Sequence, residues 1–94
     1  EKSQIYYMSD GKNIYIQRGF YMDGIIENAN IKKFEILENG YSKDNKKVYY
    51  LSKELKNFDI KTFRSYPEMI RSSVEYNAKD KNNYYRDGRI VKLK

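Results

Sequence analysis

The feature that most constrains the fold of this 94-residue chain is a short motif that occurs three times. The segments DGKNIYI at 10–16, DNKKVYY at 44–50 and DKNNYYR at 80–86 align without gaps. Each begins with an aspartate and carries a tyrosine five residues later, and successive aspartates are 34 and 36 residues apart. A repeat of this length is typical of one supersecondary unit. The chain is therefore predicted to be a single domain, residues 1–94, made of similar units.

A second block recurs between the copies of the motif. NANIKKFEIL at 28–37 aligns with NFDIKTFRSY at 57–66, so that an Ile and a Phe lie three residues apart in both. This spacing places both side chains on one side of a single helical turn, which we expect Asn30 and Asp59 to cap. Two and a half repeat units are thus expected, at about 7–40, 41–75 and 76–94.

Each unit is interpreted as a turn followed by short strands. Asp and Asn side chains bond to nearby backbone, so the motif begins with turn chemistry. The segments IYI, VYY and YYR that follow consist mostly of strand-forming residues. Asp87-Gly88 predicts a tight hairpin turn after the motif strand of the third unit. Leu51-Ser52 occupies the same place in the second unit. In the first unit this turn is expected to be longer, over 17–24. The predicted fold class is mainly β, an antiparallel meander of short strands with short helical turns, and a small α+β fold is the alternative.

The second unit carries an insertion before the third aspartate. It contains YPEMIRSS at 66–73. Pro67 suits the first position of a helix, Glu68 its first turn and Arg71 its last. A short helix is therefore expected in the insertion.

The combined pattern resembles a known family. Y-x-K-D-x-x-x-V-Y-Y followed by N-x-D-I-K-T-F, together with AKDKNNYYRDGR at 78–89, resembles the DKNYY family of bacterial repeat proteins over roughly residues 7–91. The first unit departs most, since Gly11 and Ile16 replace the usual lysine and second tyrosine, and Arg86 replaces that tyrosine in the third unit. The resemblance implies an unassigned function, often in exported or cell-envelope proteins, and supplies no catalytic residue.

The composition argues against catalysis. The chain has no cysteine and no histidine, so it lacks disulfides, the commonest metal ligands and the commonest general base. Asp44 and Asp80 could offer oxygens to Ca²⁺, but neighbouring lysines would oppose a cation. Glu35 and Glu38 are expected to be ordinary surface charges. We therefore predict no enzyme activity, no catalytic residue, no metal and no cofactor.

Eleven tyrosines and a net charge of +6 suggest a binding surface. Because strand side chains alternate between faces, the tyrosines five residues after each aspartate should form one column and their neighbours another. One column is expected in the core and the other partly exposed. The lysines are spread along the chain among acidic residues, which does not favour a nucleic-acid partner. The predicted contact residues are Tyr41, Lys47, Tyr50 and Arg86.

The leading functional hypothesis is a non-enzymatic repeat domain that binds another protein at or outside the bacterial cell envelope. One alternative is an immunity protein that neutralises a cognate toxin, which would act in the cytoplasm. Another is a weak nucleic-acid binder that uses a Lys/Tyr surface. No apolar run approaches a membrane span. A chain that begins with Glu1 is consistent with a removed export signal or lipid anchor, while the partner and the oligomeric state stay open.

Overall fold

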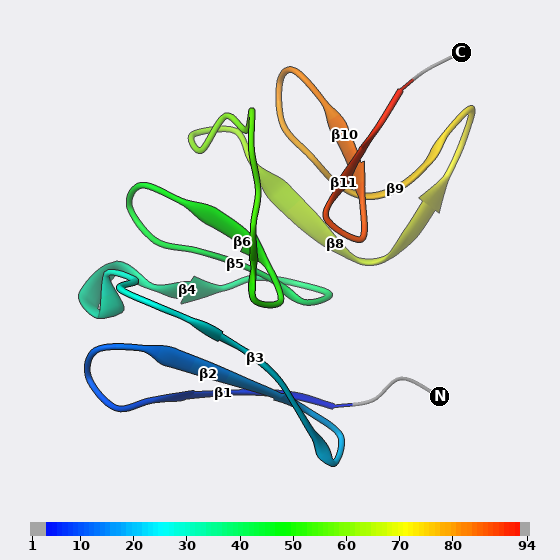
Figure 1. Cartoon of the computed structure of the whole chain (residues 1–94). Helices are drawn as coiled ribbons and strands as arrows, with labels where there is room; N and C mark the ends of the chain where they lie inside the picture. Colours follow the sequence, from blue (N-terminus) through cyan, green and yellow to red (C-terminus); the bar gives the residue numbers. More distant parts are fainter. Residues whose placement is uncertain (1–3, 93–94) are drawn as a thin grey trace.

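The computed structural model describes residues 4–92, and the protein is mainly β, with three antiparallel sheets (Figure 1). The first sheet has the order β1 (Ile5–Ser9), β2 (Ile14–Arg18), β3 (Tyr21–Ile26). The second has the order β4 (Glu35–Ile36), β5 (Tyr41–Lys43), β6 (Val48–Tyr50), β7 (Lys53–Glu54). The third has the order β11 (Arg89–Val91), β10 (Tyr84–Arg86), β9 (Glu75–Lys79), β8 (Arg64–Arg71). The predicted antiparallel meander is confirmed. The α+β alternative is wrong, because the helical structure within 4–92 is one 3₁₀ turn, η1 (Ile31–Lys33).

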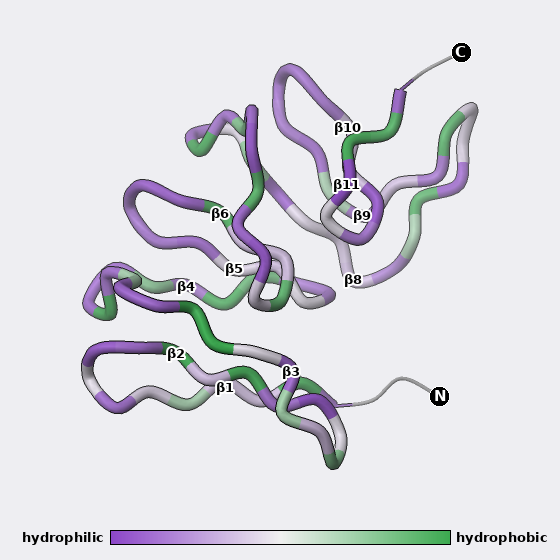
Figure 2. The backbone as a smooth tube through the Cα atoms, in the orientation of Figure 1, coloured by the Kyte–Doolittle hydropathy of each residue, from purple (hydrophilic) through white to green (hydrophobic). Residues whose placement is uncertain are grey.

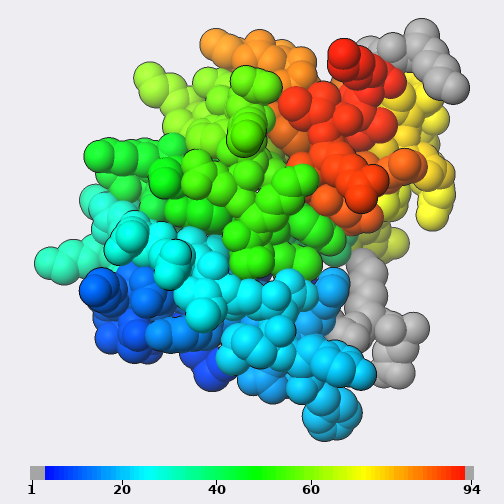
Figure 3. Space-filling view, viewed as in Figure 1, coloured from blue at the N-terminus to red at the C-terminus, as the bar shows by residue number. Residues whose placement is uncertain are grey.

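Each sheet contains one copy of the repeated motif. The strands β2, β6 and β10 carry the residues that follow the three aspartates, and each pairs with the strand before it and the strand after it. The sheets lie in chain order, with the first and the third on opposite sides of the second (Figures 1 and 3). The strands β4 and β8 fall at the ends of the units expected at 7–40 and 41–75, yet each pairs with the sheet that follows it.

One hydrophobic cluster fills the space between each pair of neighbouring sheets. The cluster between the first and second sheets consists of Ile14, Ile16, Ile26, Ala29, Tyr49 and Leu51. The cluster between the second and third sheets consists of Tyr41, Val48, Leu55, Phe63, Ala78 and Tyr85. Tyr50 packs against both clusters. Figure 2 shows the corresponding pattern, with hydrophobic stretches along the strands and hydrophilic residues at many of the turns.

The helix expected over 66–73 is wrong, because this segment belongs to β8 as far as Arg71. β8 is one of the two edge strands of the third sheet, and within residues 4–92 only β9 pairs with it. A proline such as Pro67 is tolerated in an edge strand because it has fewer ladder hydrogen bonds to lose. The register of β8 against β9 shifts between Ser65 and Ile70, because an advance of five residues along β8 matches an advance of two residues along β9, and this irregularity accommodates part of the insertion.

The long turn expected over 17–24 is also wrong. β2 and β3 continue up to a two-residue connection, Gly19-Phe20, and a bulge after Ile16 absorbs one additional residue of β3. The hairpin predicted at Asp87-Gly88 is confirmed, with φ values of 48° and 81° at these two residues. Positive φ at both positions is what a tight turn between twisted strands requires.

Candidate functional site

The motif aspartates close the turns in which they lie. Oδ1 of Asp10 accepts hydrogen bonds from the backbone N–H groups of Lys12 and Asn13 at 2.9 and 2.8 Å. Asp44 and Asp80 accept the corresponding pair of bonds at 2.8–2.9 Å, so the predicted turn role of both is confirmed. The backbone N–H of Asn13 and the Tyr15 hydroxyl lower the pKa of Asp10 to about 2.

The second carboxylate oxygen of Asp44 and of Asp80 joins two neighbouring units. Oδ2 of Asp44 accepts the backbone N–H of Asn30 at 3.0 Å, and Oδ2 of Asp80 accepts that of Asp59 at 2.7 Å. The prediction that the Asn30 side chain caps a helical turn is wrong, because that side chain forms no capping hydrogen bond. Asn30 instead contributes its backbone N–H, which donates to Asp44. Burial alone would raise the pKa of Asp80, but the N–H of Asp59 and further donors outweigh it and lower that pKa.

The same arrangement of aromatic rings occurs at both junctions. At the first junction, Phe34 lies between Tyr7 and Tyr49, with ring centroids 6.1 and 6.4 Å apart. At the second, Phe63 lies between Tyr41 and Tyr85, at 5.6 and 5.2 Å.

The tyrosine five residues after the aspartate therefore packs against the preceding unit in both cases. Tyr49 and Tyr85 are buried in the core, and burial raises the pKa of Tyr49 to about 12.

The third member of this column, Tyr15, lies on a face of the first sheet that the described chain leaves uncovered. Met8 and Ile25 pair with Tyr15 in the strand register, and Tyr6 and Met22 pair with its neighbour on the same face, Gln17. We call this surface the first outer face, and its apolar side chains are 45–58% exposed: Tyr6, Met8, Met22 and Ile25. Sequence reasoning missed it, although β2 begins with three apolar residues in a row and so presents apolar side chains on both faces.

The opposite end of the molecule presents the last outer face, formed by the third sheet. The rings of Tyr66 and Tyr76 are 6.0 Å apart, and those of Tyr76 and Tyr84 are 4.5 Å apart. Nζ of Lys79 lies 5.8 Å from the centroid of the Tyr84 ring. Arg64 lines the same depression as Lys79 and Tyr84. This face is therefore aromatic and cationic, whereas the first outer face is mainly apolar.

The structure places the predicted contact residue Tyr41 in the core and not on a surface. Its side chain is fully buried. Its hydroxyl donates a hydrogen bond to Oδ1 of Asn77 at 2.7 Å and accepts one from the backbone N–H of Gly88 at 3.0 Å. Tyr41 therefore connects the second sheet to the third.

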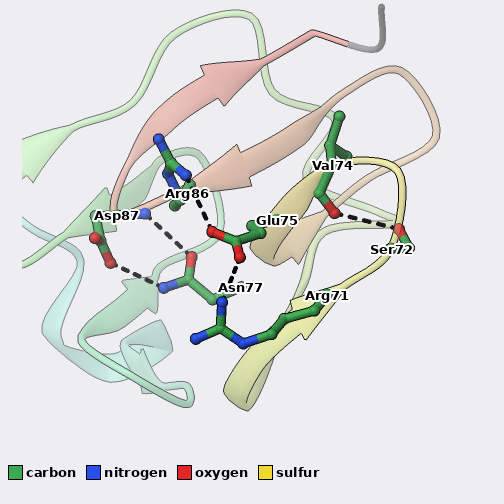
Figure 4. A network of polar contacts seen from close by, with 7 residues as sticks. All are labelled: Arg71, Ser72, Val74, Glu75, Asn77, Arg86 and Asp87. Carbon is green, nitrogen blue, oxygen red and sulfur yellow. Dashed lines mark hydrogen bonds and ion pairs between the residues drawn. The ribbon is translucent and has the colours of Figure 1, made fainter.

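Two other predicted contact residues, Tyr50 and Arg86, come together in one open depression of about 620 Å³, which Asp87 and Arg89 also line. The half-buried Tyr50 donates a hydrogen bond from its hydroxyl to Oδ1 of Asp87 at 3.3 Å. Arg86 lies 3.4 Å from a carboxylate oxygen of Glu75 (Figure 4).

The fourth predicted residue, Lys47, lies at the other end of β6. There it pairs with Glu54 at 3.4 Å. The structure thus brings together two of the four residues, and their role in binding stays a prediction.

Further properties of the described segment bear on function. Between Gln4 and Lys92 no group of three or more Asp, Glu, His or Cys side chains is placed to hold a metal ion. The same residues contain no helix with the length and hydropathy needed to cross a bilayer. Comparison with models of protein families gives a match to the DKNYY family over residues 1–89. No curated protein and no solved structure matches.

Proposed function

This chain belongs to the DKNYY family, and we propose that it is a non-enzymatic repeat domain that binds another protein at or outside the bacterial cell envelope. The observation that carries the proposal is the first outer face. On it, four large apolar side chains of one sheet are 45–58% exposed, and Phe20 and Tyr21 at the end of the same hairpin are 100% and 78% exposed. Contiguous apolar surface of this kind marks sites of interaction with other proteins.

The corresponding surfaces of the other two units support this proposal. Tyr49 and Tyr85, the equivalents of Tyr15, are buried against a neighbouring unit. The face that carries this tyrosine is therefore a contact surface wherever a neighbour is present.

The location at the envelope rests on the resemblance to exported and cell-envelope proteins of the family. We expect an antibody against the native protein to detect it in the envelope or culture-medium fraction of the source bacterium. Detection in the cytoplasmic fraction alone would contradict that part of the proposal.

A pull-down with matched variants tests the binding function. Ile25→Lys places a charge on the first outer face, whereas Ile36→Lys makes the same change at a 60% exposed site on β4. We expect the wild type and Ile36→Lys to retain the same protein from a lysate and Ile25→Lys to lose it. Equal retention by all three would refute the use of this face. Retention of a toxin would favour the immunity-protein alternative.

Binding of single-stranded nucleic acid is a second candidate function, which the last outer face favours. The rings of Tyr66, Tyr76 and Tyr84 contact one another in series, and the cation of Lys79 lies over the Tyr84 ring. Aromatic rings beside cations are typical of surfaces that stack bases. This function predicts binding of labelled single-stranded RNA or DNA that weakens steeply as salt is raised. Fluorescence anisotropy that stays flat at low salt would exclude it.

A further inference from the structure

We infer that the first outer face of one molecule takes the last outer face of a second copy of this chain, so that copies associate head to tail. This inference rests on the proposed function, because it names the partner of the same face. Three observations carry it: the equivalence of the end faces to the inner contacts, the aromatic groups on the last outer face, and the charges at the two ends.

The inner contacts all have the same polarity. At each contact, one unit contributes the tyrosine five residues after its aspartate. The preceding unit contributes side chains four or six residues after its own aspartate, and these groups pack into one cluster. Tyr49 thus shares a cluster with Ile14 and Ile16, and Tyr85 shares one with Val48. Tyr15 at one end of the molecule, and Tyr84 with Arg86 at the other, are the members of this series that have no neighbouring unit in the described chain. The two end faces are therefore opposite halves of the contact that already occurs twice inside the molecule.

The last outer face provides an aromatic group of the kind used at the inner contacts. Tyr7 and Tyr41 lie three residues before their aspartates, whereas Tyr76 lies four before Asp80. The additional residue, Asn77, is directed to the second sheet, where its side chain bonds to Tyr41. Tyr76 packs against Tyr84 instead, and so occupies on the last outer face the place of Tyr7 and Tyr41.

The charges of the two ends are complementary. Beside the first outer face, Oδ2 of Asp10 accepts a hydrogen bond from the Tyr15 hydroxyl. Within residues 4–92, no backbone N–H of another unit donates to this oxygen. Asp44 and Asp80 use the same oxygen to bind the neighbouring unit. On the last outer face, Arg64 and Lys79 line one depression and supply positive charge. A carboxylate at one end thus meets cations at the other, which favours this orientation of two copies.

A contact between different faces leaves one free face of each type on every assembly. Head-to-tail association is therefore open-ended, whereas a contact between two first outer faces would be two-fold and would stop at the dimer. The stoichiometry of association thus distinguishes the two arrangements.

Two variants that each block one face provide the test. Ile25→Lys blocks the first outer face, and Met22→Lys, at a 58% exposed site, repeats the block in case the former does not fold. The double change Arg64→Glu and Lys79→Glu reverses the charge of the last outer face. By sedimentation velocity, we expect the wild type to grow past the dimer with concentration and each blocked variant to be monomeric. An equimolar mixture of the two variants should double the mass and stop there.

Several outcomes would overturn the inference. They are a monomeric wild type, association that neither block removes, and a last-face variant that dimerises alone. The wild type could be monomeric and still retain another protein in the pull-down, with retention lost in Ile25→Lys but not in Ile36→Lys. That result would refute this inference and leave the proposed function standing. Equal retention by Ile25→Lys and Ile36→Lys would refute the proposed function itself.

Discussion

The two oxygens of a motif aspartate have different partners. Oδ1 closes the turn of its own unit, and Oδ2 of Asp44 and Asp80 binds the unit before it. The turn role could be predicted from sequence, since Asp followed by Asn and Lys is local turn chemistry. The joint could not, because the donors Asn30 and Asp59 lie 14 and 21 residues before the aspartates that they bind, and nothing local specifies that contact.

Replacing the aspartate at a joint should cost more stability than replacing the one at the free end. Asp80→Ala leaves the N–H groups of Asp59, Asn82 and Asn83 without their acceptor and should lower the free energy of unfolding by about 2–3 kcal/mol. Asp10→Ala affects only its own turn and Tyr15, and should cost clearly less. Urea titration of the two variants checks this order, and an equal loss would contradict a role of Asp80 between units.

The pKa shifts of these aspartates predict a loss of stability in acid. The folded-state pKa of Asp10 is lowered from 3.8 to about 2, and those of Asp44 and Asp80 are also lowered. A lowered pKa stabilises the fold above the unfolded-state pKa, and this stabilisation is lost as pH falls through the folded-state value. The midpoint of urea unfolding should therefore decrease as pH falls from 3.8 towards 2. The variant Asp80→Asn should lose less over this range, and an unchanged loss would contradict the assignment.

Two tyrosines at equivalent positions should respond differently to loss of the hydroxyl. The hydroxyl of Tyr41 is bonded to Asn77 and Gly88, so Tyr41→Phe should lower the free energy of unfolding by about 1–3 kcal/mol. The hydroxyl of Tyr7 is buried and, among residues 4–92, has no hydrogen-bond partner. Tyr7→Phe should therefore be neutral or stabilising. Thermal unfolding followed by circular dichroism compares the two, and a destabilising Tyr7→Phe would disprove this account.

At the scale of elements, the hairpin turns form part of the contacts between sheets. The turn at Asp87-Gly88 could be predicted because its signal is local, but its contact with Tyr50 of the second sheet could not. Pro67 shows the limit of local signals, since a proline suits both the start of a helix and an edge strand. The position of the segment 64–71 beside β9 decided between them.

Substitution of Gly88 should reveal this contact. An added Cβ would lie 2.8 Å from Cβ of Tyr50, and φ is +81°. Gly11 has a similar φ of +90°, but a Cβ there would have no atom within 4 Å. Both changes to alanine incur backbone strain of about 1 kcal/mol, and Gly88→Ala should cost at least about 1 kcal/mol more through overlap with Tyr50. Equal losses in denaturant titration would show that the turn does not press on the second sheet.

At the scale of the whole molecule, two clusters that share Tyr50 hold three sheets together. The mainly β class could be predicted from the repeats. The uncovered first outer face could not, because it depends on which side of each sheet a neighbour occupies. The polarity of the stack, with Tyr49 and Tyr85 both directed to the preceding unit, became visible only in three dimensions.

Shared packing predicts that the sheets unfold together. Ile16 is fully buried in the first cluster, and Ile16→Ala should lower the free energy of unfolding by about 2–5 kcal/mol. Hydrogen exchange of amides in β9 and β10, far from the substitution, should accelerate as much as exchange in β2. Acceleration confined to the first sheet would show that the units unfold separately.

The bond between an aspartate and the preceding unit has a consequence for how such chains can evolve. Its donor is the main-chain N–H of Asn30 or Asp59, a group that every residue except proline possesses. The joint therefore does not depend on which side chain occupies the donor position, as the presence of Asn in one unit and Asp in the other illustrates. A gene duplication that adds one unit supplies a working joint at once, without a compensating substitution in the neighbouring unit. Arrays of different length can thus arise from one unit by duplication, and their end faces can then diverge freely.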